Sequence, residues 1–116
     1  MKTRKEIKNE YKQMKFPMGV FQIRNILNDK VFIGSNLHVV AEWNSQKFQL
    51  NAGMHPNAAL QKDWKELGAK NFVYEILEEI KESEDKPLDY AKEIKTLEKL
   101  YLEKFQTNPE KVYNRL

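Results

Sequence analysis

Two different spacings of apolar residues alternate along the chain and divide it into predicted strands and helices. Between residues 18 and 35, apolar and polar positions alternate on either side of Asn28 and Asp29, which predicts a β-hairpin that turns at this pair. The alternation returns over residues 71–80 and predicts a third strand. The chain therefore supplies three strands, enough for one small sheet.

Helical spacing, with apolar residues three or four positions apart, fills most of the remaining chain. Helices are predicted over residues 3–15, 37–50, 57–67 and 88–105. Ser35 or Asn36 can cap the second helix and Asn57 the third, and Gly53 and Gly68 end them. The element order α-β-β-α-α-β-α predicts an α+β domain in which helices flank a small three-stranded, antiparallel-type sheet.

Glu98 lies on the apolar face of the last predicted helix. At about 100° per residue, one arc of this helix contains Tyr90, Ala91, Ile94, Leu97, Tyr101 and Phe105. Glu98 falls inside the same arc, which we expect to pack on the sheet. A buried carboxylate is costly unless it is protonated, paired or bound to a cation. Glu98 therefore indicates either a functional cleft or a salt bridge to a lysine at the edge of the core.

Composition limits the class of protein. The 116 residues fit one domain, which can bury a core without metal or disulfide support. Because the chain has no cysteine, disulfides and thiolate zinc sites are excluded. No stretch approaches the roughly 20 apolar residues that a membrane span needs, so we expect a cytoplasmic protein without a membrane partner.

Positive charge is concentrated at the N-terminus. Residues 1–15 carry a net charge of +4, whereas the whole chain carries +3. We therefore divide the chain into a basic N-terminal helix or arm over residues 1–16 and a domain over residues 17–116. Lys8 and Lys12 of this arm could contact nucleic-acid phosphates, although a solvated helix is the more common origin of such a charge run.

Two triplets, each with a glycine and an aromatic residue, flank the predicted hairpin turn. Residues 19–21 read Gly-Val-Phe, and residues 32–34 read Phe-Ile-Gly with Ser35 next. Together with the segments 50–64 and 71–77, the inward-facing Glu98 and the late pair Tyr113-Asn114, these triplets resemble the GIY-YIG nuclease domain. That domain is found in phage homing endonucleases and in the incision nuclease of bacterial excision repair. The resemblance covers about residues 18–114 and implies the fold of this family.

The resemblance also implies a chemistry and assigns roles by position. Glu98 would bind Mg²⁺ or another divalent metal, which neutralises the scissile phosphate. His55 and Asn114 match the histidine and the late asparagine of the family, and Gly34 would let the substrate approach closely. In the family, two tyrosines of the triplets and an arginine on the following helix assist the attack of water on the phosphodiester.

The chain departs from the family at three of these positions. Phe21 and Phe32 replace the tyrosines, and Glu42 replaces the arginine just before Trp43. General acid–base help and charge stabilisation are each worth roughly 10²-fold or more in rate. We therefore expect a degenerate active site in a protein associated with DNA or another nucleic acid, with phosphodiester cleavage lost or weakened.

Two other functions remain open. The first is an active divalent-metal-dependent DNA endonuclease, in which Glu98 holds the metal and no tyrosine serves as base. The second is a protein-interaction module without a nucleic-acid partner, docking through the apolar face of the hairpin. On that face, a two-residue turn would place Phe21 and Phe32 together, whereas a three-residue turn would move Phe32 to the other side.

The individual site residues also have structural explanations. Phe21 and Phe32 suit packing in a hairpin. Glu42 suits a solvent-facing helix surface, and a repurposed metal or ligand site is the alternative. His55 can be a loop or capping residue. Three basic residues around the presumed cleft could meet phosphates or could be isolated surface charges: Arg24, Lys30 and Lys47.

Overall fold

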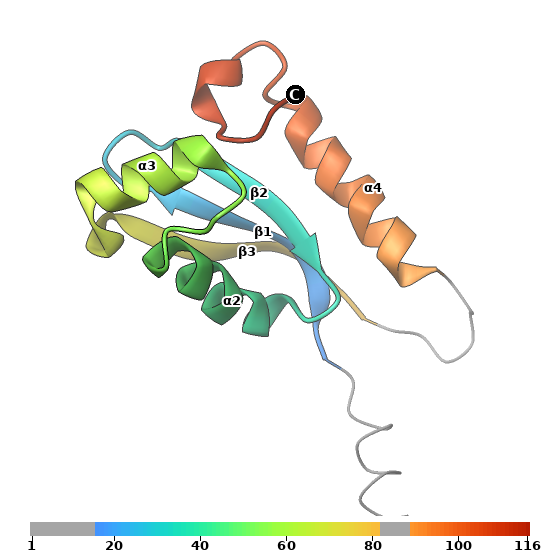
Figure 1. Ribbon diagram of the computed structural model, residues 1–116. Coiled ribbons are helices and arrows are strands. Elements are labelled where there is room, and N and C mark those ends of the chain that lie inside the picture. Colours follow the sequence, from blue (N-terminus) through green and yellow to red (C-terminus); the bar gives the residue numbers. More distant parts are fainter. Residues whose placement is uncertain (1–15, 82–88) are drawn as a thin grey trace, which may run out of the picture.

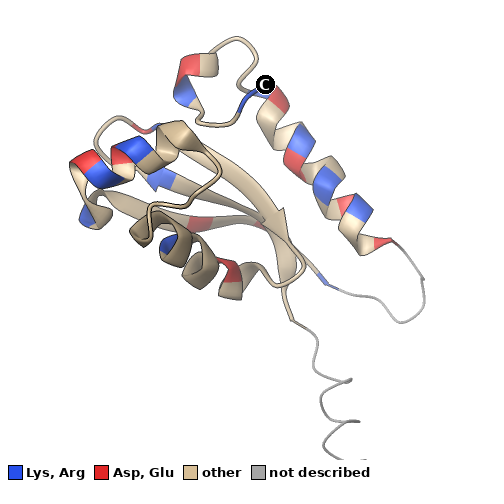
Figure 2. Ribbon diagram, viewed as in Figure 1, with Lys and Arg blue, Asp and Glu red and all other residues tan. Residues whose placement is uncertain are grey.

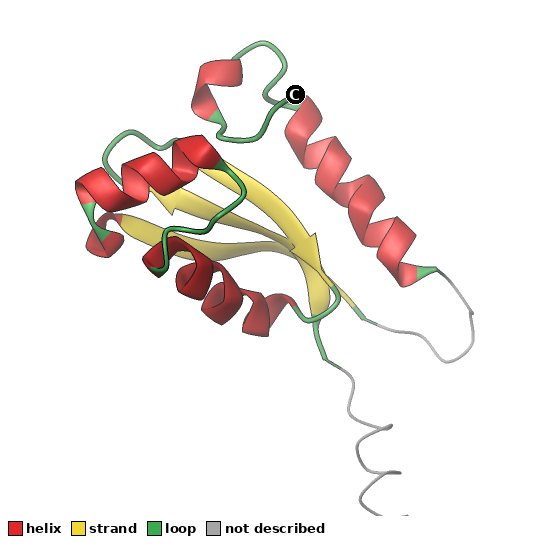
Figure 3. Cartoon of the chain, viewed as in Figure 1, coloured by secondary structure: helices red, strands yellow, loops and turns green. Residues whose placement is uncertain are grey.

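The computed structural model of the protein describes residues 16–81 and 89–116 (Figures 1 and 3). In chain order the elements are β1 (Met18–Asn25), β2 (Val31–Asn36), α2 (Val39–Asn51), α3 (Ala58–Leu67), the 3-10 turn η1 (Ala69–Asn71), β3 (Phe72–Ile80), α4 (Tyr90–Glu103) and the 3-10 turn η2 (Pro109–Lys111). The strands form an antiparallel sheet with the order β2-β1-β3. The predicted α+β class and sheet are confirmed, while the helix predicted over 3–15 lies outside the described residues.

The sheet separates two hydrophobic clusters. On one face, α2 and α3 cover Phe21 and Ile23, which are at most 1% exposed (Figure 1). On the other face, α4 and the chain after it cover Val20 and Ile33. Neighbouring strand residues point to opposite faces, so the central strand β1 contributes to both clusters. A substrate site must therefore lie at the rim of the sheet, because its middle is covered.

The hairpin turn is longer than the sequence predicts. Ile23 pairs with Phe32 and Phe21 with Gly34, whereas a two-residue turn at Asn28 and Asp29 would have paired Asn25 with Phe32. The loop closes earlier, with a hydrogen bond from the Asn25 N–H to the Lys30 carbonyl at 2.9 Å. Because the register differs by two residues, each side chain keeps its face, and Phe21 and Phe32 do share one.

The side chains of the loop explain this register. Asn25 Oδ1 accepts from the N–H of Leu27 at 3.0 Å, and Asn28 Oδ1 accepts from the N–H of Lys30 at 2.9 Å. Asp29 has a φ of 60°, in the left-handed region that aspartate tolerates better than most residues. These local bonds stabilise a longer turn than the one predicted.

Most predicted helix ends are confirmed, with one correction. Asn57 Oδ1 accepts from the N–H of Leu60 and caps α3, while Gly53 and Gly68 have φ values of 73° and 89° after α2 and α3. The cap predicted for α2 is wrong. Asn36 bonds instead to the N–H of His38, and His38 occupies the cap position without a side-chain hydrogen bond.

The C-terminal segment covers the outer edge of β2. Val112 forms a parallel bridge with Val31, and the Tyr113 N–H donates to the Val31 carbonyl at 2.7 Å. Asn114 continues the pairing with its side chain, because its amide accepts from the N–H of Ile33 at 2.8 Å and donates to the Ile33 carbonyl at 2.7 Å. The edge is thereby protected from other strands. Among the described residues, no helix has the length and apolar character to cross a membrane.

Candidate functional site

The glycine of each triplet leaves room for a neighbouring group of the sheet. A Cβ atom on Gly34 would lie 2.5 Å from Cζ and 2.9 Å from Cε1 of Phe21. A Cβ atom on Gly19 would overlap the carbonyl oxygen of Glu78 on β3, where β1 and β3 shift register after Val20. Packing within the sheet therefore explains both glycines. The Phe21 ring fills the space at Gly34 that the sequence assigns to an approaching substrate.

Both triplet phenylalanines take part in aromatic packing. The centroid of the Phe21 ring lies 5.0 Å from that of Tyr74 and 6.5 Å from that of Phe32. Trp43 of α2 stacks on Tyr74 with centroids 5.2 Å apart. The Tyr74 hydroxyl donates to the carbonyl of Val39, and burial raises the pKa of this hydroxyl, with the Glu42 charge adding to the shift. Tyr74, which packs against Phe21, is therefore poorly suited to act as a base.

Glu42 lies at the centre of a chain of hydrogen bonds. One carboxylate oxygen accepts from Asn36 Nδ2 at 2.7 Å, and the other accepts from Gln46 Nε2 at 2.8 Å. The Oε1 atom of Gln46 is 2.5 Å from Nε2 of His55, which is 7% exposed. These hydrogen bonds join the end of β2, one face of α2 and the loop before α3. Glu42 is thus bonded within the protein, rather than only solvated on a helix surface.

The hydrogen bonds of His55 and its burial favour the neutral imidazole. Its Nδ1 accepts from the N–H of Asn57 at 3.0 Å, so the ring proton lies on Nε2, which donates to Gln46. Burial lowers the pKa of His55 below its ordinary value near 6.5. The ring also meets Phe32 edge-on, with centroids 5.2 Å apart. Both ring nitrogens are therefore occupied by protein groups.

Glu98 reaches the sheet from the opposite face. Its side chain is 17% exposed, and its Oε1 accepts from the Ser35 hydroxyl at 3.2 Å and lies 3.7 Å from Nζ of Lys95. Ser35 and Asn36 are consecutive at the end of β2, so their side chains leave the strand on opposite sides. Glu98 and Glu42 thus approach the same strand end from different faces. Within the part of the chain that the structure describes, no hydrogen bond or ion pair links them.

Comparison with known proteins gives this arrangement a family. The chain is 36% identical over 67 residues to intron-associated endonuclease 1 of Enterobacteria phage T4. These residues are 58% of this chain and 27% of that relative, so the match spans about a quarter of its length. No family model matches the chain.

Solved structures cover more of the chain. The catalytic domain of the homing endonuclease I-TevI is similar with a TM-score of 0.68 and 28% identity, over 85% of this chain and 98% of that domain. A mutant of the same domain gives a TM-score of 0.69 and 27% identity, over 85% and 93%. Together, the sequence and structure matches support a GIY-YIG nuclease domain in this chain. The match agrees with the positions of the two GIY-YIG triplets on paired strands.

The GIY-YIG asparagine position has a structural role in this chain. Both polar atoms of the Asn114 amide bond to the backbone of Ile33, as described above. A catalytic role for Asn114 stays a prediction, because in this conformation the amide oxygen and one of its two N–H groups bond to Ile33 and the second N–H is left for another partner.

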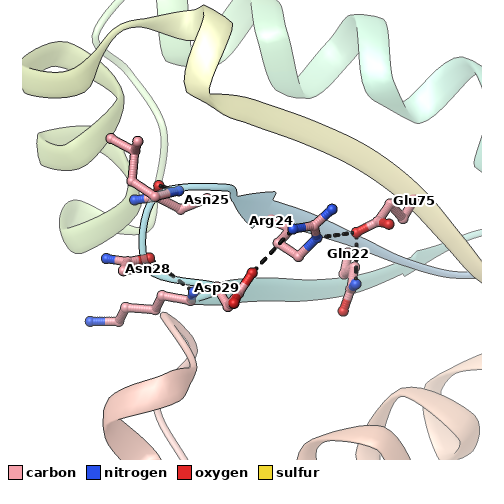
Figure 4. Close-up of polar contacts among 8 residues, drawn as sticks. Gln22, Arg24, Asn25, Asn28, Asp29 and Glu75 are labelled. Carbon is pink, nitrogen blue, oxygen red and sulfur yellow. Dashed lines mark hydrogen bonds and ion pairs between the residues drawn. The ribbon is translucent and has the colours of Figure 1, made fainter.

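The predicted phosphate-binding residues lie apart from one another. Figure 4 shows Arg24 on the α4 face of the sheet, where its guanidinium meets Glu75 at 2.8 Å and Asp29 at 3.1 Å. Two hydrogen bonds to the Glu75 carboxylate lower its pKa, and the bond from Arg24 has a larger effect than the bond from Gln22. Lys30 and Lys47 lie over the rings of Tyr113 and Trp43, 4.7 and 5.1 Å from the centroids. Lys8 and Lys12 lie outside the described residues.

The metal that the GIY-YIG family implies would be held by Glu98. Both neighbours of this carboxylate contact Oε1, and Oε2 has no hydrogen bond or ion pair within the described residues. Protein Mg²⁺ sites often use one or two carboxylates and complete the shell with water and substrate phosphates, so the residues fit such an ion. No group of three or more His, Asp or Glu side chains in residues 16–81 and 89–116 could hold a metal. Glu42 and Glu98 bond to consecutive residues of β2 whose side chains leave the strand on opposite faces, which separates the two carboxylates.

Sequence reasoning missed two residues of the site. Gln46 has no role in the sequence-based predictions, yet it connects Glu42 to His55. Ser35 was considered as a helix cap, yet its hydroxyl contacts Glu98. Glu42 and Gln46 are four residues apart on one helix, and this spacing is the sequence signal that could have identified their hydrogen bond.

Proposed function

We propose that this protein is a nucleic-acid-binding member of the GIY-YIG family in which phosphodiester cleavage is lost or strongly weakened. The observation that carries this proposal is the hydrogen-bonded chain from Asn36 through Glu42 and Gln46 to His55. It has a carboxylate where a charge-stabilising arginine is expected, and it occupies Nε2 of the histidine, whose Nδ1 accepts from the N–H of Asn57. Among the residues matched by position, Glu98 keeps a carboxylate oxygen without a hydrogen bond or ion pair to any described residue.

The missing hydroxyls strengthen this proposal. Phe21 and Phe32 cannot accept a proton from water, and Tyr74 beside them has its hydroxyl occupied and its pKa raised. General bases contribute roughly 10²- to 10⁴-fold to rate, and a positioned charge stabiliser contributes a comparable factor. A carboxylate at the Glu42 position would also repel an approaching phosphate.

Nucleic acid is the partner that the relatives support, since the similar proteins are named endonucleases. The charged residues fit this partner only in part. In Figure 2, they gather on α3 and α4, with both signs interspersed, while α2 has few. We therefore expect moderate, salt-sensitive binding rather than a strongly basic groove.

An active endonuclease is the second candidate, and the free Oε2 of Glu98 favours it. A divalent metal held there would act as a Lewis acid on the scissile phosphate. The third candidate is a module that docks through the apolar face of the hairpin, and this face is covered by helices. Phe21 and Ile23 of that face are buried under α2 and α3 at no more than 1% exposure.

One reaction tests binding and cleavage together. Labelled duplex DNA is incubated with the protein and Mg²⁺, and portions are run on native and denaturing gels at several salt concentrations. The proposal predicts a shifted, intact duplex whose shift weakens as salt rises. If no shift occurs even at low salt, the proposal that the protein binds nucleic acid is wrong. If a shortened strand appears on the denaturing gel, the proposal that the active site is degenerate is wrong.

Restoring the lost groups provides a sharper form of the same test. The triple substitution Phe21→Tyr, Phe32→Tyr and Glu42→Arg should produce measurable cleavage if only the chemistry is missing. Adding Glu98→Ala to the triple variant should abolish it again. A folded triple variant that binds DNA and leaves it intact would show instead that the arrangement of the site has diverged.

A further inference from the structure

A cavity of about 660 Å³ opens next to Phe32, between the start of α3 and the C-terminal segment. Its walls include Phe32, Pro56, Ala58, Ala59, Tyr113 and Arg115. Its size falls within the roughly 300–1,000 Å³ of small-molecule sites. Phe32 occupies a position that the family resemblance assigns to a catalytic tyrosine, whereas the other wall residues have no assigned role, so the cavity adjoins the expected cleavage site and extends beyond it.

The walls combine flat apolar surface with small side chains. Phe32 contributes a half-buried aromatic ring, and Pro56 contributes a saturated ring at the turn before α3. Ala58 and Ala59 are both exposed and leave the entrance open. Nucleobases stack on aromatic side chains irrespective of base identity. The cavity therefore offers one planar ligand a surface to stack on.

Positive charge lies at the rim. Arg115 is exposed and makes no hydrogen bond or ion pair within the described residues. Nζ of Lys30 lies 4.7 Å from the centroid of the Tyr113 ring, which also lines the cavity. The nearby carboxylate of Asp63 is engaged, because it accepts from the Tyr113 hydroxyl at 2.6 Å. Lys30 and Arg115 thus bring two cations to this side of the cavity, beside the single carboxylate of Asp63 that bonds to Tyr113.

We propose that this cavity holds one unpaired nucleotide of a nucleic-acid strand, with its base against Phe32 and its phosphate at Arg115 and Lys30. A base within an intact duplex is stacked on both sides and cannot enter a concave site without leaving the helix. The partner is therefore a single strand, or a duplex that contains an unpaired nucleotide. This inference rests on the proposed function, and it adds a preference for unpaired over fully paired nucleic acid.

Fluorescence anisotropy with three labelled probes tests the inference: a twelve-nucleotide thymidine strand, a blunt duplex, and that duplex with one extra thymidine. The wild-type protein should bind the first and third more tightly than the second. Arg115→Gln should weaken binding of the single strand about fivefold at 0.1 M salt and lower the salt slope by about 0.7, as expected for one lost phosphate contact. The matched control Lys99→Gln, on α4, should change the three affinities alike.

A second variant acts on the cavity without changing charge. Ala59→Trp, at an exposed position of the first turn of α3, should fill the entrance and abolish the preference for unpaired nucleotides. Equal binding of all probes by the wild type, or no effect of either cavity variant, would overturn this inference and leave the proposed function intact. No binding of any probe would overturn both.

Discussion

Gly34 offers a direct test of what the second triplet is for. In the substitution Gly34→Ala, the new Cβ atom would lie 2.5 Å from Cζ and 2.9 Å from Cε1 of Phe21. Carbon atoms pack best at about 3.5–4.0 Å, so the ring would have to move by roughly 1 Å. Phe21 is 1% exposed and lies against Tyr74, which leaves it little room. We expect a loss of about 1–3 kcal/mol in the free energy of unfolding.

A double-mutant cycle with Phe21→Leu identifies the cause, because leucine lacks the Cζ atom that the new Cβ meets. Urea unfolding of the wild type, both single variants and the double variant gives the coupling energy. In the Phe21→Leu background, Gly34→Ala should cost less than about 1 kcal/mol. An equal cost in both backgrounds would refute the steric explanation, and a neutral effect in the wild type would show that the ring yields freely.

Two further predictions concern buried polar groups. His55 has a lowered pKa in the fold, so below pH 6.5 the unfolded chain gains a proton that the folded chain does not, and stability falls by up to about 1.4 kcal/mol per pH unit as pH drops. In chemical unfolding between pH 7.5 and 5, His55→Gln should flatten this dependence relative to His38→Gln, and equal slopes would contradict the neutral imidazole. Asn114→Ala leaves the N–H and carbonyl of Ile33 without their partner and should cost about 1–3 kcal/mol. The control Asn108→Ala, at an exposed amide, should stay within about 0.5 kcal/mol, and a similar cost in both would refute the edge-pairing role of Asn114.

Local signals in the sequence predicted most of the fold. Gly53, Gly68 and Asn57 mark helix ends through backbone conformation and capping, which depend on few neighbours. The turn length was missed because Asn25 and Asn28 bond to nearby backbone groups and lengthen the loop. Competition between alternative local hydrogen bonds is not visible in a pattern of apolar positions.

The sequence predicted the position of a site residue only where a single helix or strand determines that position. Helical periodicity placed Glu98 on the inner face of α4, and its side chain is 17% exposed. The contact of Glu98 with Ser35 and the path from Glu42 to His55 each join separate elements. Such contacts depend on how the layers pack, so position in a family motif indicated where these residues lie but not what they bond to.

Cleavage of supercoiled plasmid tests the central proposal most directly. Purified protein is incubated with plasmid and either Mg²⁺ or Mn²⁺, beside the same protein with Glu98→Ala, and the topological forms are separated on agarose. A degenerate site predicts that the plasmid stays supercoiled with both proteins. Nicking by the wild-type protein that disappears with Glu98→Ala would contradict the proposal and establish an active nuclease.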